Sequence, residues 1–387
     1  MRWLRLAAAL TIAAGFATGA GAAEAPKPTF QPDGTVKVPA FDLPPSGLMS
    51  AEAADMLRKR SQGARPPLPA DAGIAQVRQR SEENWAPVLA AMRERYSVDV
   101  AEQHIGGVPV RVVTPRGKPV DAKRVLINLH GGGFAWCADA CRMLESIPIA
   151  AVGGFKVVTV DYRMAPEARH PAGVEDLAAV YAALLKHYKP KQIGVYGCSA
   201  GGTLSAQAAA WFPAHGLPQA GAVGIFGSGA VIYKPGDANY LAAYVDGSFA
   251  PPPPPGAPPR PSMDRLYFDG SDTTDAIISP ALHPEVLAKF PPTLLITGTR
   301  AMEMSAVTFT NTQLLKAGVP STMVVQEGHG SLLLLPSATA GVARHLRHHR
   351  PLLPPEPGLG GIVGDRSGRS HRLLRVEISH CRLSCTW

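Results

Sequence analysis

Residues 197–201 read Gly-Cys-Ser-Ala-Gly and place one hydroxyl in a Gly-x-Ser-x-Gly pattern. An apolar stretch, 193–196, precedes the pattern, and a helix-favouring stretch begins at Thr203. A chain that passes from strand to helix in so few residues must turn sharply, and glycine permits this because it has no Cβ. Such a turn holds a serine in a strained, outward-pointing conformation. The pattern predicts Ser199 as a nucleophile for acyl transfer, and a tight turn without chemistry is the alternative.

A second motif, His-Gly-Gly-Gly-Phe at 130–134, follows an apolar stretch at 125–129. Consecutive glycines at a strand end leave backbone N–H groups free to converge on one atom. Acyl transfer needs such donors because the carbonyl oxygen becomes an anion, and losing one donor typically costs ~3 kcal/mol. We expect an oxyanion hole made by the amides of Gly132, Gly133 and Ala200. Ala200 stands at a helix start, where the dipole favours negative charge.

A phosphate-binding loop is the rival interpretation of these glycines. The chain has neither Gly-Lys-Ser/Thr nor Gly-x-Gly-x-x-Gly at this point, which argues against a nucleotide. His130 is expected to orient the loop rather than to carry protons. Residues 161–167, Asp-Tyr-Arg-Met-Ala-Pro-Glu, end another strand candidate. We expect their charges to form a structural network behind the glycine loop, and a direct catalytic role is the alternative.

These motifs, in this order and with Pro-Ala-Gly-Val-Glu-Asp at 171–176, resemble the hormone-sensitive-lipase-like esterases of the α/β-hydrolase class. The resemblance covers about residues 95–330. It implies an α/β fold with a mostly parallel sheet of eight strands and an N-terminal helical cap. It also implies hydrolysis of short or medium acyl esters, which are small molecules, without metal or cofactor. Cys198 stands where the family usually has Asp, at a position of the motif that tolerates change.

A serine esterase also needs a base and an acid that orients the base. In α/β-hydrolases both follow the serine, with the acid first and the histidine last. The family pattern places Asp where this chain has Ala301, and Glu303 is the nearest carboxylate. The pattern places His where this chain has Ser331, and His329 lies two residues earlier. We predict Glu303 as the acid and His329 as the base, and surface positions without catalytic roles are the alternative for both.

Two functions follow from these residues. The leading hypothesis is a serine carboxylesterase that works through an acyl-enzyme intermediate. The alternative is a catalytically impaired α/β-hydrolase-fold protein that binds small acyl ligands or a protein partner, and Ala301 and Ser331 motivate it. A lipase acting at membranes would need a large apolar lid, which the sequence does not show. The pattern leaves the oligomeric state open.

Short apolar stretches alternate with helical ones from about residue 98 onward. This alternation predicts a mostly parallel sheet with helices on both faces. Gly106-Gly107 joins the first two strand candidates, which predicts a hairpin at one edge. The strand candidates are 98–104, 108–114, 124–129, 156–160, 191–196, 221–226, 293–297 and 321–326, and the helix candidates are 140–152, 173–188, 200–212 and 302–317.

Four further regions complete the organisation. Residues 23–97 form a Pro-rich linker and a helical cap, with helices expected at Ser50–Arg60 and Ala72–Tyr96. The core, 98–330, carries a Pro-rich insertion at 227–275. We expect a lid over the sheet there, and a proline-rich protein-binding segment is the rival. Residues 331–387 are a basic tail of atypical composition. One interpretation is disorder, and another is a reading-frame change near residue 330, which the gene sequence tests.

The N-terminus has the pattern of a secretory signal peptide over residues 1–22. Arg2 and Arg5 precede an apolar run, 6–16, and Ala20-Gly21-Ala22 offers a small-residue cleavage site. The run is shorter than the ~20 residues that span a bilayer, so an uncleaved anchor is the less favoured alternative. We expect an exported protein, periplasmic or secreted, without stable membrane insertion after cleavage.

Charge and cysteine content exclude other classes. The net charge is +8, but the two leader arginines and a surplus of five positive charges after residue 343 leave only +1 for the body. This body gives no electrostatic footprint for nucleic acid. Five cysteines are too few for a disulfide scaffold. Cys137 and Cys141 are expected to share a helix face and to pack rather than to form a disulfide, and we expect no metal site.

Overall fold

The computed structural model describes residues 27–62, 68–69, 71–246 and 263–331. The chain divides into two compact units, residues 1–47 and 48–387. In the first unit, β1 (Thr29–Phe30) pairs antiparallel with β2 (Val36–Lys37). All chemistry discussed below lies in the second unit.

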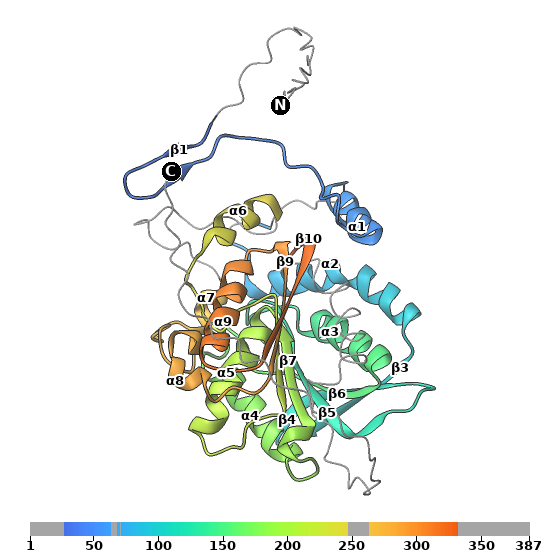
Figure 1. Ribbon diagram of the computed structural model, residues 1–387. Helices are drawn as coiled ribbons and strands as arrows, with labels where there is room; N and C mark the ends of the chain where they lie inside the picture. The colour runs from blue at the N-terminus through green and yellow to red at the C-terminus, as the bar shows by residue number, and fades with distance from the viewer. Residues whose placement is uncertain (1–26, 63–67, 70, 247–262, 332–387) are drawn as a thin grey trace, which may run out of the picture. The chain divides into compact units, whose positions relative to one another are not determined.

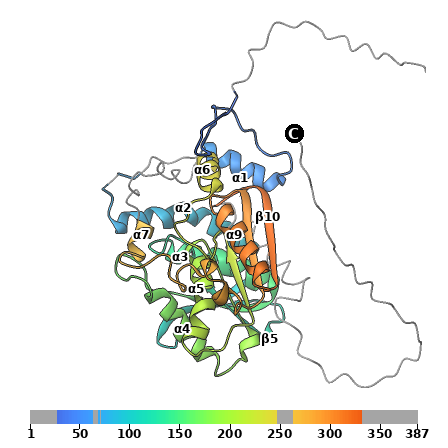
Figure 2. The same cartoon turned by 60° about the vertical axis from the view of Figure 1, so that its left-hand side comes forward.

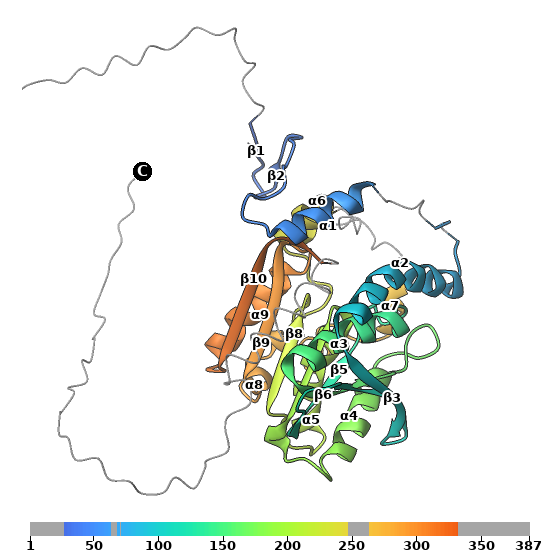
Figure 3. The same ribbon diagram turned by 90° about the vertical axis from the view of Figure 1, so that its right-hand side faces the viewer.

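The second unit is built on a sheet of eight strands in the order β10-β9-β8-β7-β5-β6-β4-β3. β4 runs antiparallel to both of its neighbours, and the other pairs are parallel. β10 and β3 therefore lie at opposite edges (Figure 3). The strands are β3 (Val98–Ile105), β4 (Val108–Pro115), β5 (Asp121–Leu129), β6 (Phe155–Val160), β7 (Ile193–Cys198), β8 (Ala222–Phe226), β9 (Thr293–Arg300) and β10 (Ser321–Gly330). All eight predicted strands and the predicted hairpin are confirmed.

Helices cover both faces of this sheet (Figures 1 and 2). Alternate residues along each strand point to opposite faces, so Ile127 and Val195 join one apolar cluster while Leu126 and Tyr196 join the other. The first cluster is closed by α4 (Ala172–Leu184), α5 (Ala200–Ala214) and α9 (Met304–Lys316), and the second by α3 (Ala138–Gly153) and α2 (Ile74–Arg95).

The two helices expected before the sheet are present. α1 (Ala51–Gln62) begins after Ser50, whose Oγ accepts the N–H of Ala53 at 3.1 Å, as an N-cap should. α2 was expected as a cap only, yet its C-terminal half packs on α3. Met92 is buried there beside Leu144. The last turns of α2 therefore belong to the layer that covers the sheet.

The insertion at 227–275 is described in part, and Pro251–Pro255 lie outside the described residues. It carries α6 (Asp237–Asp246) and α7 (Met263–Tyr267). Three short elements complete the fold: η1 (Pro190–Gln192), η2 (Pro280–Leu282) and α8 (Pro284–Leu287). None of the helices in the described ranges is long and apolar enough to cross a membrane. The predicted signal peptide and all but the first residue of the predicted tail also lie outside these ranges.

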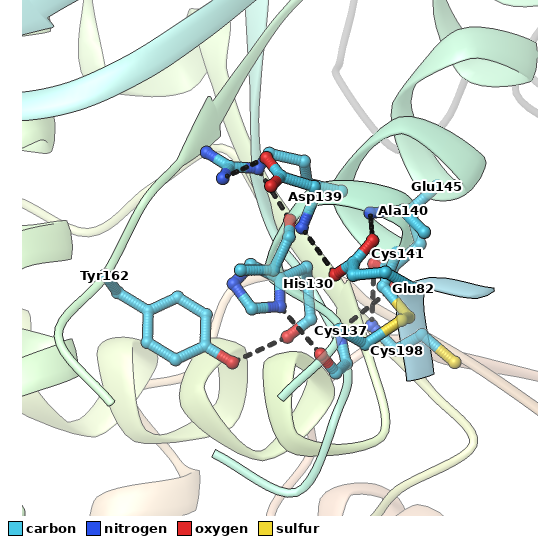
Figure 4. The surroundings of a disulfide bond; sticks show 12 residues. Glu82, His130, Cys137, Asp139, Ala140, Cys141, Glu145, Tyr162 and Cys198 are labelled. Atoms are coloured by element: carbon cyan, nitrogen blue, oxygen red, sulfur yellow. Dashed lines mark hydrogen bonds and ion pairs between the residues drawn. A yellow bond between two sulfur atoms is a disulfide. The ribbon is translucent and has the colours of Figure 1, made fainter. Parts of the chain in front are cut away.

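One expectation is wrong: Cys137 and Cys141 form a disulfide (Figure 4). The sequence suggested two positions on one helix face, where a bridge fits poorly. However, α3 begins only at Ala138, and Cys137 precedes it in the left-handed conformation, with φ of 60°. This brings the two Cα atoms to 5.3 Å, within the usual range for a disulfide.

Candidate active site

Ser199 occupies the turn between β7 and α5, as predicted. Its φ is 52° and its ψ is −119°, a backbone conformation that non-glycine residues rarely adopt. Two hydrogen bonds hold it there. The N–H of Ser199 donates to the carbonyl of Phe226 at 2.8 Å, and its carbonyl accepts the N–H of Thr203 at 3.0 Å. The side chain is partly exposed. A constrained and accessible hydroxyl is the arrangement that a nucleophile requires.

The glycines of the motif are required by crowding. A Cβ on Gly197 or on Gly201 would overlap the carbonyl oxygen of Leu129, the last residue of β5. Only glycine therefore lets the turn approach the neighbouring strand. The same crowding brings the glycine loop to the serine, because a Cβ on Gly131 would lie 3.5 Å from Cβ of Ser199.

The three predicted oxyanion donors belong to the glycine loop and to the first residue after Ser199. Gly132 and Gly133 have φ of 113° and 55°. The carbonyl of Gly132 accepts the N–H groups of Ala135 and Trp136 at 3.0 and 2.9 Å, which closes the loop on itself. Among the described residues, the N–H groups of Gly132, Gly133 and Ala200 have no hydrogen-bond acceptor. These donors are available to an anion beside Ser199.

Glu145 is a feature of the site that the sequence analysis missed. It lies on α3, is 1% exposed, and accepts the N–H of Gly131 at 2.8 Å and that of Cys198 at 3.2 Å. Asn128 donates to it at 2.9 Å. Burial raises the pKa of Glu145 to about 8, against the opposing effect of these donors. The sequence does contain a sign of this role, because Glu145 is the one charged residue in the mostly apolar stretch 143–151.

His130 has the structural role that we expected. Its Nδ1 donates to the carbonyl of Gly131 at 2.7 Å, and its ring stacks on Tyr162 with centroids 4.4 Å apart. The hydroxyl of Tyr162 in turn donates to the carbonyl of His130 at 2.8 Å. Burial lowers the pKa of His130 to about 4, so the ring is neutral near pH 7. The pair fixes the entry to the glycine loop.

The charged segment 161–167 forms the expected network. Asp161 pairs with Arg142 at 3.4 Å, and Arg163 pairs with Asp176 at 3.0 Å. Glu167 receives two hydrogen bonds of 2.7 Å from Arg78 of α2. Arg78 also donates to the carbonyls of Ala135 and Ala165 at 2.7 and 2.9 Å. These contacts tie α2 to the segment that follows the glycine loop.

The predicted acid and base lie toward the β10 edge of the sheet, after β9 and in β10. Glu303 accepts a 2.5 Å hydrogen bond from the hydroxyl of Ser331, and that hydroxyl also accepts the N–H of Met302 at 3.3 Å. Ala301 is fully buried. The residue in the family's histidine position therefore contacts the predicted acid, but it is a serine. Glu303 also acts electrostatically on the residue before Ser199. Burial is the main cause that raises the pKa of Cys198, and Glu145 and Glu303 raise it further.

His329 lies in β10, 7% exposed, with its Cβ and carbonyl against Gly298 of β9. Its Nδ1 donates to the carbonyl of Glu327 at 3.0 Å. No hydrogen bond between described residues joins His329 to Ser199 or to Glu303. β8 and β9 separate β10 from β7, a span of about 14 Å at the usual strand spacing. The structure places the start of the glycine loop close to Ser199, and it shows no hydrogen bond between Ser199 and His329 within the described residues.

Among the described residues, no group of three or more His, Cys, Asp and Glu side chains is arranged to hold a metal ion. The site that the structure presents is thus a serine, a set of free amide donors and a carboxylate–hydroxyl pair.

Comparison with known proteins places this site in a family. Residues 126–332 match the family described as the alpha/beta hydrolase fold, and the chain belongs to it. The crystal structure of an esterase, E25, is similar with a TM-score of 0.69 and 26% identity, over 82% of this chain and 98% of that one. An esterase of the bacterial hormone-sensitive lipase family matches at a TM-score of 0.62 and 23% identity, over 76% and 96% of the two chains.

Arylacetamide deacetylase of Oryctolagus cuniculus is 38% identical over 127 residues, which are 29% of this chain and 31% of that protein. The chain spans about a third to a half of the length of the first curated relatives that it matches. The resemblance to hormone-sensitive-lipase-like esterases that the sequence motifs indicated is confirmed at the level of family and fold.

Proposed function

We propose that this protein is a serine carboxylesterase that hydrolyses short or medium acyl esters of small molecules. The observation that carries the proposal is the free N–H groups of Gly132, Gly133 and Ala200 beside a strained, accessible Ser199. Names of relatives support it, because they include an arylacetamide deacetylase and several esterases.

In the proposed reaction, Oγ of Ser199 attacks the ester carbonyl, and the three amides bind the oxygen as it becomes an anion. The tetrahedral intermediate collapses to an acyl-serine and releases the alcohol. Water then attacks the acyl-serine, and the acid leaves. The reaction needs no metal or organic cofactor, because the nucleophile and the donors all come from the chain.

His329 is the proposed base, and Glu303 the proposed orienting acid. Nδ1 of His329 donates to a carbonyl, which leaves Nε2 as the atom that takes the proton of Ser199 and then gives it to the leaving alkoxide. In this proposal the segment 327–331 moves and carries the imidazole from β10 toward Ser199. Replacing His329 by Ala then lowers the rate to that of the unassisted serine.

The direct test is hydrolysis of p-nitrophenyl butyrate by the purified protein and by its Ser199→Ala variant. The proposal expects turnover by the first and only background release by the second. Equal rates in the two proteins, whether fast or slow, would contradict the proposed serine esterase function.

The contact between Ser331 and Glu303 favours a second candidate, a catalytically impaired member that binds acyl compounds or a protein partner. Loss of triad members can cost ~10⁴ to 10⁶ in rate. Calorimetric titration with ethyl butyrate separates the two candidates. Saturable heat of binding without Ser199-dependent release of acid favours the impaired member.

We also propose that the protein is exported after cleavage of residues 1–22. The disulfide between Cys137 and Cys141 supports this, because such bonds persist in oxidising compartments. The mass of the N-terminal peptide of the mature protein tests the proposal. A mature chain that still begins at Met1 would contradict it.

A further inference from the structure

One buried carboxylate connects the two motifs of the site. Oε1 of Glu145 accepts the N–H of Gly131, the first glycine of the loop. Oε2 accepts the N–H of Cys198, the residue before Ser199. Figure 4 shows Glu145 close to Cys198 and to the start of α3. The partners lie 14 and 53 residues from Glu145 along the chain, so no local rule brings these three residues together.

A third partner fixes how the carboxylate is oriented. Nδ2 of Asn128 donates to Oε2 at 2.9 Å. The amide of Asn128 is itself held in place, because its Oδ1 accepts hydroxyl groups of Thr159 at 2.8 Å and Ser146 at 3.3 Å. All of these side chains are buried, and Asn128 is fully so. The carboxylate thus accepts from β5, the glycine loop and β7, and its donor on β5 is itself held by hydroxyls of β6 and α3.

We propose that Glu145 is a positioning residue that sets the spacing between the glycine loop and the Ser199 turn, so that the free amides of the loop face the hydroxyl. The expected effect on kcat rests on the proposed function. The expected protection of the Gly131 and Cys198 amides from exchange does not depend on turnover.

The partners of Glu145 are all donors and therefore suit its ionised form, which only accepts. Because burial raises the pKa of Glu145 to about 8, this form prevails above that pH. Both backbone N–H groups are fixed donors. The side-chain amide of Asn128 donates here through Nδ2, and turning it over would reverse its contacts with Thr159 and Ser146. Glutamine has the same shape but carries one NH₂ group. That group must oppose either the N–H of Gly131 or the N–H of Cys198 together with Asn128. One side of the connection is lost in either orientation.

Glu145 acts through the loop and does not touch the reacting atoms. Between described residues it makes no hydrogen bond to Ser199, and the donors it engages are different from the three that remain free. Glu145 therefore leaves Gly132, Gly133 and Ala200 available to substrate while it occupies Gly131 and Cys198. This division separates a positioning role from that of a catalytic residue.

The kinetic test compares Glu145→Gln with Glu94→Gln, the same substitution at an exposed position of α2. Misplacing a catalytic group by about 1 Å can cost ~10²-fold in rate. We expect kcat for p-nitrophenyl butyrate to fall about 10²-fold in Glu145→Gln with KM changed less than threefold, and Glu94→Gln to match the unmodified protein. A folded Glu145→Gln variant with kcat within threefold of the unmodified protein would overturn the inference.

The structural test is amide hydrogen exchange, followed by NMR after selective labelling with ¹⁵N-glycine and ¹⁵N-cysteine. In the unmodified protein we expect slow exchange at Gly131 and Cys198, and faster exchange at Gly132 and Gly133. Glu145→Gln should speed exchange at Gly131 or Cys198, and Glu94→Gln should not.

The two tests separate the two ideas. If the unmodified protein and Ser199→Ala hydrolyse the ester equally, the proposed function fails, and exchange alone decides the role of Glu145. Equal exchange at Gly131 and Gly132 in the unmodified protein overturns the inference without any variant. If Glu145→Gln does not fold, this last comparison still decides it.

Discussion

The two halves of the candidate site differ in the contacts that their residues make. The nucleophile half, made by the ends of β5 and β7 and the start of α5, holds Ser199 in a strained turn beside three free amides. The acid–base half, made by the ends of β9 and β10, holds Glu303 against Ser331 and His329 against its own backbone neighbour. The two halves thus differ in how closely the structure brings their candidate residues together.

The difference shows that one half of a catalytic site can keep its geometry without the other. The nucleophile half lies at the centre of the sheet, where Glu145 and the packing of Gly197 and Gly201 fix it. The other half lies on an edge strand and depends on residues near 301 and 331. A change there leaves the centre of the sheet in place.

The largest expected effect comes from giving the second half the residues of the family pattern. Ser331 already contacts Glu303, so an imidazole at 331 would meet a carboxylate. We expect Ser331→His, alone or with Ala301→Asp, to raise kcat/KM for p-nitrophenyl butyrate by about 10² to 10⁴, the usual contribution of a general base.

Ser331→Ala is the matched control for this gain. It removes the hydrogen bond to Glu303 and adds no base, so we expect no rise in rate. A gain in Ser331→Ala equal to that in Ser331→His would show that release of Glu303, rather than a new imidazole, is responsible.

The next effect tests the nucleophile half. A Cβ on Gly132 would overlap the carbonyl of Trp136, and its φ of 113° disfavours any other residue. We expect Gly132→Ala to lower kcat by about 10² to 10³, the typical loss for one oxyanion donor. Gly107→Ala is the control: its φ is 82°, but a Cβ there meets nothing within 4 Å. If both variants lose activity equally, backbone strain and not the site is at fault.

The disulfide beside the glycine loop should contribute mainly to stability. A bridge that closes so short a loop is worth about 2 kcal/mol on a chain-entropy basis. We expect the double variant Cys137→Ser, Cys141→Ser to lose about that much free energy of unfolding in a urea titration. The unmodified protein with dithiothreitol should shift by the same amount. No shift under either condition would contradict a formed disulfide.

The last effect is a pH dependence of stability due to Glu145. Its folded pKa is about 8 against an ordinary value of 4.5, so between these values the native state keeps a proton that the unfolded chain has lost. The free energy of unfolding should therefore fall as pH rises through this window, by at most about 1.4 kcal/mol per pH unit. Tyr162, Tyr196 and Cys198 interact electrostatically with Glu145 and stay neutral, because burial raises the pKa of each.

His130 has the opposite sign, so the measurement belongs above pH 6.5. Its folded pKa is about 4, and its contribution to stability is lost as pH falls from 6.5 toward 4. Urea titrations of the unmodified protein and of Glu145→Gln between pH 6.5 and 8.5 isolate Glu145. Identical slopes in the two proteins would contradict the raised pKa.

The fold and the nucleophile half were predictable from sequence because both rest on local rules. Strand period, the Gly106-Gly107 turn and the glycines around Ser199 are constraints that each stretch of chain carries by itself. Glu145 was not predictable, because its partners are backbone groups far away in sequence. The disulfide was missed because the left-handed conformation of Cys137 follows from where α3 begins, and a periodicity does not show that.

Trapping the acyl-enzyme tests the central claim most directly. The protein is mixed with p-nitrophenyl butyrate, quenched in acid within the first turnovers, digested and analysed by mass spectrometry. The account predicts a butyryl group on the peptide that contains Ser199, and no such group in Ser199→Ala. Ester hydrolysis that proceeds at the same rate in both proteins, with no butyryl group on this peptide, would contradict it.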